Sequence, residues 1–186
     1  MTSESGIIHR TSFALEKYRR GESAPYAIEQ WEGNSGLNVG LNYLTALLCG
    51  GIVSTGSYNY SWGPDLYDAD HGFSEGYAYI GVGDDDTASD PAQTGLQAAV
   101  NFNWQECYED DGVVNPLVDG NTITWYAWWW YEDEAAFEWK EYVLAHHYWD
   151  DAINDYNYLA LLRGTKSLGL KSGDDAWKLK ITVVFS

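Results

Sequence analysis

The sequence predicts an all-β protein, a jelly-roll-like antiparallel β-sandwich with one short helix and an extended N-terminal arm. Two observations predict this fold. Segments with alternating apolar and polar residues are separated by turns rich in Gly, Asp and Asn, a pattern typical of sandwiches. Aromatic residues, which strands favour, make up 16% of the 186 residues. A chain of this length can form one solid core, so we expect an arm over residues 1–32 and a sandwich domain over residues 33–186.

The first 32 residues differ from the rest in charge. Four bases offset the acids there, and apolar residues are sparse. This composition is typical of an arm that becomes ordered only where it docks; the alternative is a flexible tail. We expect the arm to reach a neighbouring subunit, with four candidate interface residues: Arg10, Phe13, Arg19 and Arg20.

The helix is expected over Asn38–Leu48. Leucines recur there at spacings of three and four, and Gly50-Gly51 follows as a stop signal. After it the pattern changes to strands. Residues 77–83 predict a strand that leads into the acidic turn Asp84–Asp86, and residues 94–102 predict a weaker strand.

Residues 122–131 predict a strand with aromatic side chains on both faces. Alternation puts Trp125, Ala127 and Trp129 on one face, and Tyr126, Trp128 and Trp130 on the other. A small domain buries one face readily, so the second face needs a partner or a covering loop. We therefore expect Trp128 and Trp130 to be interface residues. The run Trp128-Trp129-Trp130 could otherwise belong to the core or form a platform on which sugars stack.

Three further strands complete the predicted sandwich, over residues 136–145, 156–162 and 176–185. The last alternates cleanly, with Trp177, Leu179, Ile181, Val183 and Phe185 facing inward. Lys178, Lys180 and Thr182 face outward in this interpretation. We expect the inward residues of this strand to be integral to the core.

The charge distribution excludes whole classes of function. The chain carries a formal charge of −18, and it has no lysine or arginine between Arg20 and Lys140. A surface without cations cannot neutralise phosphates, so we expect no nucleic-acid partner and no anionic membrane partner. No run approaches the roughly 20 apolar residues of a membrane span. The polar start Met1–Ser5 predicts no signal peptide, so we expect a soluble protein made in the cytoplasm.

No motif of catalysis or of metal binding stands out, so we expect no enzymatic activity, no cofactor and no metal. The acidic turn Asp84–Asp86 and the run Tyr67–His71 lack the spacing of a calcium loop and are interpreted as solvated turns. His146 and His147 are adjacent, so a strand would direct them to opposite faces; we expect them in a loop. Cys49 and Cys107 match no metal spacing, and we expect both to be free thiols.

Four segments in the same order resemble a group of tailed-bacteriophage virion proteins. They are Asn38–Leu44; Ala78–Asp84 with Gln93–Ala98; Phe137–Glu141; and Leu161–Arg163 followed by Ser167–Ser172 and Trp177–Thr182. The resemblance covers roughly residue 36 to the C-terminus. Two segments depart from it, the Tyr-, Gly- and Asp-rich insert Gly56–His71 and the segment Ala145–Asp155, where the group has a shorter turn.

The resemblance implies a structural protein of the virion. The leading hypothesis is a capsid decoration (cement) protein that stabilises the head shell, a homo-oligomer and specifically a trimer, with the major capsid protein or another virion protein as partner. A tail or neck protein is the alternative. A carbohydrate-binding module is the alternative from another class of function.

Overall fold

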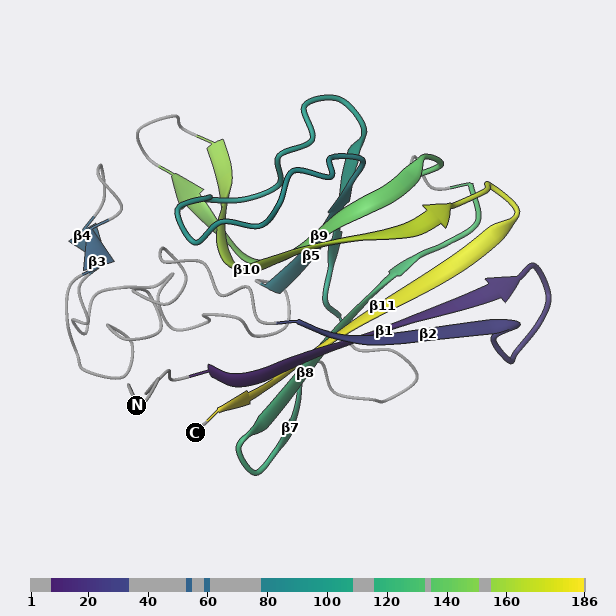
Figure 1. Ribbon diagram of the computed structural model, residues 1–186, viewed down its shortest axis with the longest axis horizontal. Coiled ribbons are helices and arrows are strands. Elements are labelled where there is room, and N and C mark those ends of the chain that lie inside the picture. The colour runs from purple at the N-terminus through teal and green to yellow at the C-terminus, as the bar shows by residue number, and fades with distance from the viewer. Residues whose placement is uncertain are drawn as a thin grey trace.

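A computed structural model of the chain describes residues 8–33, 53–54, 59–60, 78–108, 116–132, 135–150 and 155–185. These residues form two antiparallel sheets that pack face to face, and a separate two-stranded ribbon (Figure 1). The predicted antiparallel β-sandwich is therefore confirmed. The expected helix Asn38–Leu48 lies outside the described residues.

The five-stranded sheet has the order β2-β1-β11-β8-β7. Its strands are β1 (Ile8–Arg19), β2 (Ala27–Gly33), β7 (Leu117–Asp119), β8 (Thr122–Trp129) and β11 (Asp175–Phe185). The long strands β1, β11 and β8 lie side by side at its centre (Figure 1). The sheet thus joins the two ends of the described chain.

The four-stranded sheet has the order β10-β9-β5-β6. Its strands are β5 (Ala78–Gly83), β6 (Phe102–Glu106), β9 (Glu138–Asp150) and β10 (Asp155–Leu170). Strands β3 (Val53–Ser54) and β4 (Asn59–Tyr60) form the small ribbon. Strands β9 and β10 are longer than the sequence predicts, and the segment from Asp84 to Asn101 runs between β5 and β6 without regular structure.

The core lies between the inner faces of the two sheets. Trp139 of β9 packs edge-on against Trp129 of β8 and Trp177 of β11, at centroid distances of 4.8 Å in both pairs. All three indoles are at most 1% exposed. Edge-to-face pairs add stability beyond the area they bury, by about 0.5–1.5 kcal/mol each. These three rings therefore fasten the two sheets together.

The predicted faces of β8 and β11 are confirmed. Trp125, Ala127 and Trp129 are buried on β8. On β11 the buried residues are Trp177, Leu179, Ile181 and Val183, while Phe185 at the end of the strand is only partly buried. Alternation predicted these faces because one side of each strand meets the core. Cys107 is a buried free thiol, as predicted, and burial raises its pKa well above the ordinary value.

The prediction of an N-terminal arm is wrong for residues 8–33. Strand β1 pairs with β11 from Ile8 to Arg19 and with β2 on its other side, so it is a central strand. Phe13 and Leu15 lie in the core, 3% and 0% exposed. Between them and the turn, the inward position is occupied by Lys17, one of the four bases of the expected arm. Its ammonium lies 4.4 Å from the centroid of the Trp177 ring.

Two smaller predictions are also corrected. Of the weaker strand predicted over residues 94–102, only Phe102 belongs to a strand, because the preceding residues cross the outer face of the four-stranded sheet. His146 and His147 lie in β9 rather than in a loop. His146 is 2% exposed, whereas His147 contacts the rings of Tyr79 and Tyr158. Burial lowers the pKa of His147.

Candidate functional site

The outer face of the five-stranded sheet carries a cluster of aromatic rings around one lysine. We call Tyr18, Tyr126, Trp128, Trp130 and Lys178 the aromatic–lysine cluster. Alternation in β8 turns Tyr126 and Trp128 away from the core, and the β8–β11 register sets Lys178 opposite Trp128. Three strands therefore build the cluster, and its members lie up to 160 residues apart in the sequence.

The aromatic rings of the cluster pack directly against one another. Trp128 and Trp130 stack with centroids 4.6 Å apart and planes 8° from parallel. The Lys178 ammonium lies 4.2 Å from the Tyr126 centroid and 4.6 Å from that of Trp128, within the range of cation–π attraction. Tyr18 packs against Trp128 at 5.0 Å. The Trp130 indole N–H donates to the Tyr108 hydroxyl at 3.2 Å.

Exposure differs across the cluster. Trp130 is 42% exposed, Trp128, Tyr18 and Lys178 are half-buried, and Tyr126 is buried. Because Trp128 and Trp130 stack on each other, each ring already uses one face. The cluster is therefore a rigid surface with a partly exposed rim, rather than two open indole faces on which a sugar could stack.

The charged groups beside the cluster are paired with one another. Lys180 on β11 forms an ion pair with Glu16 on β1, and the Tyr18 hydroxyl donates to the same carboxylate at 2.7 Å. Burial raises the pKa of Glu16, but the hydrogen bonds from Lys180 and Tyr18 outweigh it and leave that pKa below its ordinary value. Further along β1, Arg10 pairs with Glu32. This face is thus nearly neutral, although the chain as a whole is strongly acidic.

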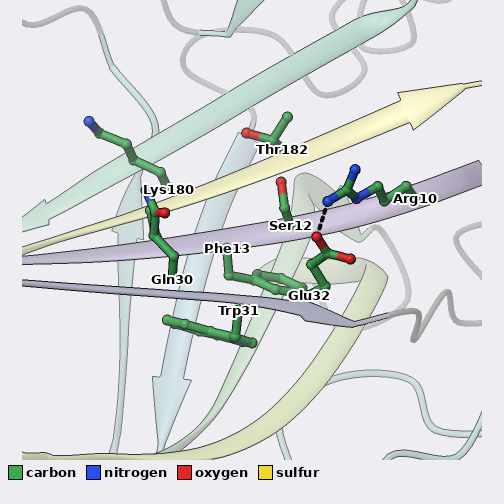
Figure 2. Close-up of a pocket in the computed structure, with 9 residues that line it drawn as sticks. Arg10, Ser12, Phe13, Gln30, Trp31, Glu32, Lys180 and Thr182 are labelled. Atoms are coloured by element: carbon green, nitrogen blue, oxygen red, sulfur yellow. Dashed lines mark hydrogen bonds and ion pairs between the residues drawn. The ribbon is translucent and has the colours of Figure 1, made fainter.

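A hollow of about 550 Å³ lies at the Arg10 end of the same sheet, around β1, β2 and β11 (Figure 2). Figure 2 shows Ser12, Thr182 and Lys180 on one side of the strands, with the rings of Phe13 and Trp31 on the other. Its described lining residues are Arg10, Ser12, Phe13, Ala14, Gln30, Trp31, Glu32, Lys180 and Thr182. Glu32 is the only acid among them, and acid–base hydrolysis of a glycoside needs two carboxylates. The hollow offers hydroxyl and amide groups for hydrogen bonding.

The outer face of the four-stranded sheet is built differently, around a buried ion pair. Glu141 of β9 and Arg163 of β10 are both 0% exposed, and the Arg163 Nε donates to Glu141 Oε2 at 2.7 Å. The Glu141 carboxylate also accepts the backbone N–H groups of Gln97 and Ala98, at 3.0 Å and 2.6 Å. The Arg163 Nη1 donates to the Thr87 carbonyl at 2.9 Å and to Gln93 at 3.0 Å.

This pair holds the segment Asp84–Asn101, which we call the strap, against the sheet. Leu96 of the strap and Trp104 of β6 pack on a second small apolar cluster that includes Val143 and Ala160. Gly83 allows the close approach, because a Cβ there would lie 2.5 Å from the Glu141 Oε1. A buried ion pair is tolerated when hydrogen bonds satisfy its ions. The contacts satisfy the Glu141 carboxylate and the Arg163 Nε and Nη1, whereas the Arg163 Nη2 makes no hydrogen bond within the described residues and lies 3.6 Å from Asp85. The role of the ion pair here is to fix the strap.

The acidic turn belongs to the strap, and the carboxylates of Asp84 and Asp85 have partners. Asp85 accepts the Thr87 backbone N–H at 2.7 Å, and these Thr87 hydrogen bonds lower the pKa of Asp85. Asp85 also lies 3.6 Å from the Arg163 Nη2. Asp84 accepts the Asn101 amide at 2.6 Å. Among the described residues, no group of three or more His, Cys, Asp or Glu side chains could hold a metal ion; the run Tyr67–His71 lies outside them.

The structure brings together only some of the predicted interface residues. Trp128 and Trp130 stack on the outer face, whereas Phe13 is a core residue and cannot be an interface residue. Arg19 lies over the Tyr26 ring at 5.0 Å, and Arg20 pairs with Glu132 at 3.4 Å. Arg10 is nine residues from Arg19 along β1, about 30 Å away. Sequence reasoning missed Tyr18 and Lys178, because only the pairing of β1, β11 and β8 sets them beside the tryptophans.

Comparisons with known proteins give no relative for this chain. No protein-family description, no curated protein and no solved structure matches it. Within the described residues, no helix has the length and apolarity that a membrane span requires.

Proposed function

We propose that the chain is a non-catalytic structural protein of a tailed virus, most simply a decoration protein bound to the head shell. The observation that carries the binding part of this proposal is the aromatic–lysine cluster. It presents rings and a lysine ammonium on a rigid sheet, and aromatic side chains are enriched in protein interfaces. The segments that resemble tailed-bacteriophage proteins support the virion setting.

The residues of those segments support a shared structural role. Glu141, Gln97, Ala98 and Arg163 come from three different segments, and they meet at the buried ion pair. Gly83, from one of the same segments, packs against Glu141. Residues that meet in this way maintain a fold. This is the pattern expected of a structural protein, in which the shape itself is the function.

The mechanism of a decoration protein is mass action. A protein that binds only the assembled shell stabilises that shell by RT ln(1 + [L]/Kd), about 2.7 kcal/mol at a free concentration 100 times Kd. No bond is made or broken. A tail or neck protein would use the same surface and the same thermodynamics, and it would differ only in location.

A cryo-EM map of the particle of the virus that encodes the chain tests the proposal. The expected result is density for the sandwich on the head shell, repeated with the shell's symmetry. Density confined to the tail or neck would replace the decoration role with the alternative. Absence of the chain from purified particles, measured by mass spectrometry, would contradict both.

A carbohydrate-binding module is the second candidate, and the hollow in Figure 2 is the observation that favours it. Ser12, Gln30 and Thr182 supply hydroxyl and amide groups, which suit the hydroxyls of a sugar, and the Trp31 ring lies on the other side of the strands. A glycan array with Gln30→Ala as the matched variant tests this role. Binding that is lost in Gln30→Ala would support it, and no binding by the unaltered protein would contradict it.

A further inference from the structure

We propose that the outer face of the five-stranded sheet is the contact between two copies of this chain, packed face to face about a two-fold axis. The inference rests on the assembly role proposed above and names one partner in it. It predicts a two-fold pair, whereas the sequence led us to expect a trimer. In a two-fold contact the same patch serves both subunits.

The composition of this face supports the contact. Two rows of side chains cross four strands: one runs Ile28, Glu16, Lys178, Trp128, and the next runs Gln30, Ala14, Lys180, Tyr126. The rim includes Ile28, 56% exposed, and Trp130, 42% exposed. The rows thus combine aromatic rings, which are enriched in protein interfaces, with charged side chains, of which Glu16 and Lys180 form an ion pair.

The charged side chains of this face are largely paired within the subunit. Glu16 neutralises Lys180, Glu32 neutralises Arg10, and Lys178 lies over two rings. A strongly charged partner would gain little from a face whose charges are already paired. A second copy presents the same nearly neutral face, so two copies of this acidic chain meet less like-charge repulsion there than on their acidic surfaces.

The acidic residues of the strap lie on the opposite side of the sandwich from this face. The strap, with Asp84, Asp85, Asp86 and Asp90, covers the outer face of the other sheet. Sheets pack about 10 Å apart, and five such spacings separate the straps of a face-to-face pair, so the two straps lie on the order of 50 Å from each other. That distance is several times the Debye length of about 8 Å at physiological salt, so their repulsion is screened. Contact through the straps would instead bring like charges together.

The size of the face sets the expected affinity. Four strands spaced about 4.8 Å apart and about 27 Å long cover on the order of 500 Å². Stable interfaces bury about 800 Å² per partner. The pair is therefore a weak one, which forms reversibly and adds to other contacts in an assembly.

Sedimentation equilibrium of the full chain over a concentration series tests the proposal. The unaltered protein should fit a monomer–dimer equilibrium. Lys178→Glu, which adds an acid to the aromatic–lysine cluster of both subunits, should raise the dissociation constant by about tenfold or more. Trp130→Ala at the exposed rim should weaken the pair in the same direction.

The matched control is Lys140→Glu, the same charge change on β9 of the other sheet. It should leave the dissociation constant within about twofold, since its charge lies away from the contact and is screened. Thermal unfolding of each variant shows whether its fold is intact. If Lys178→Glu unfolds the subunit, Trp130→Ala decides the outcome, because its side chain is the more exposed one.

Several outcomes would overturn the inference. A chain that stays monomeric at every concentration would do so, as would a trimer or an equal effect of Lys140→Glu. A monomeric chain that still decorates heads would overturn self-association and leave the proposed function intact. A dimer weakened by Lys178→Glu that is absent from virions would support the contact and contradict the virion role.

Discussion

The two outer faces of the sandwich both carry apolar and charged side chains, and these side chains are accommodated differently on each face. On the four-stranded sheet, the strap covers the small apolar cluster, and the buried pair Glu141–Arg163 holds the strap in place. On the five-stranded sheet, the aromatic–lysine cluster remains partly exposed, and the ions beside it, Glu16 and Lys180, pair with each other. One face is completed by the chain itself, and the other is suited to a partner.

The difference teaches where the chain tolerates change. Ions that are fully buried cannot lose a partner without leaving an uncompensated charge in the interior, which is strongly unfavourable. Ions on a half-exposed face keep access to water and contribute little individually. Substitutions on the strap side should therefore alter folding, and substitutions on the cluster side should alter association.

The largest expected effect is on the buried pair. Glu141→Gln removes the charge that balances Arg163 while preserving shape, and we expect a loss of about 3–5 kcal/mol in the free energy of unfolding. Denaturant titration measures it. The control is Glu32→Gln, which breaks the exposed pair with Arg10 and should cost at most about 1 kcal/mol. Equal losses in the two variants would remove the distinction between the faces.

A smaller effect is expected from glycines under and within the strap. A Cβ at Gly81 would lie 2.6 Å from the Trp104 ring, so Gly81→Ala should destabilise by about 1–3 kcal/mol through overpacking. A Cβ at Gly95 meets no heavy atom within 4 Å. Gly95→Ala should therefore be neutral or stabilising by up to about 1 kcal/mol. A stability loss in Gly95→Ala that matches the loss in Gly81→Ala would contradict the packing account.

The smallest effect concerns pH and the cluster side. The folded pKa of Glu16 lies below its ordinary value of 4.5, so its ionised form is favoured in the folded state. Its contribution to stability is present above pH 4.5 and is lost as the pH falls through the folded pKa. Denaturant unfolding is measured at a series of pH values from pH 6 downward. The free energy of unfolding should fall less steeply with decreasing pH in Glu16→Gln than in the unaltered protein. Identical pH profiles would mean that the pair with Lys180 adds nothing.

The parts of the fold that the sequence predicted are those that depend on local alternation. Strands β8 and β11 bury every second residue in regular order, so Trp125, Trp129 and Trp177 were placed correctly. Strand β1 was missed because Lys17 occupies an inward position. The groups that stabilise its ammonium are close in space but far along the sequence: it donates to Glu29 at 2.7 Å and to the Leu168 carbonyl at 2.8 Å. The sequence around a lysine does not indicate that its ammonium lies over the ring of a residue far along the chain.

The candidate sites depend on contacts between residues that are far apart in the sequence, and local sequence patterns do not predict such contacts. Glu141 and Arg163 are 22 residues apart on neighbouring strands, and the strand register shifts on either side of the pair. From sequence, both are ordinary charged residues. The tryptophans of the cluster were identified because two aromatic faces exceed what one core can bury. Lys178 was predicted to face outward, yet its position over Tyr126 and Trp128 needed the β8–β11 register.

The central claim is that the cluster side associates and the strap side does not. Hydroxyl-radical footprinting tests it with two matched side chains: Trp130 of the cluster, 42% exposed, and Phe102 on β6 beside the strap, 45% exposed. Oxidation of each is measured in dilute protein and in concentrated or shell-bound protein. The account predicts that association protects Trp130 and leaves Phe102 unchanged. Protection of Phe102 with Trp130 unchanged would contradict it.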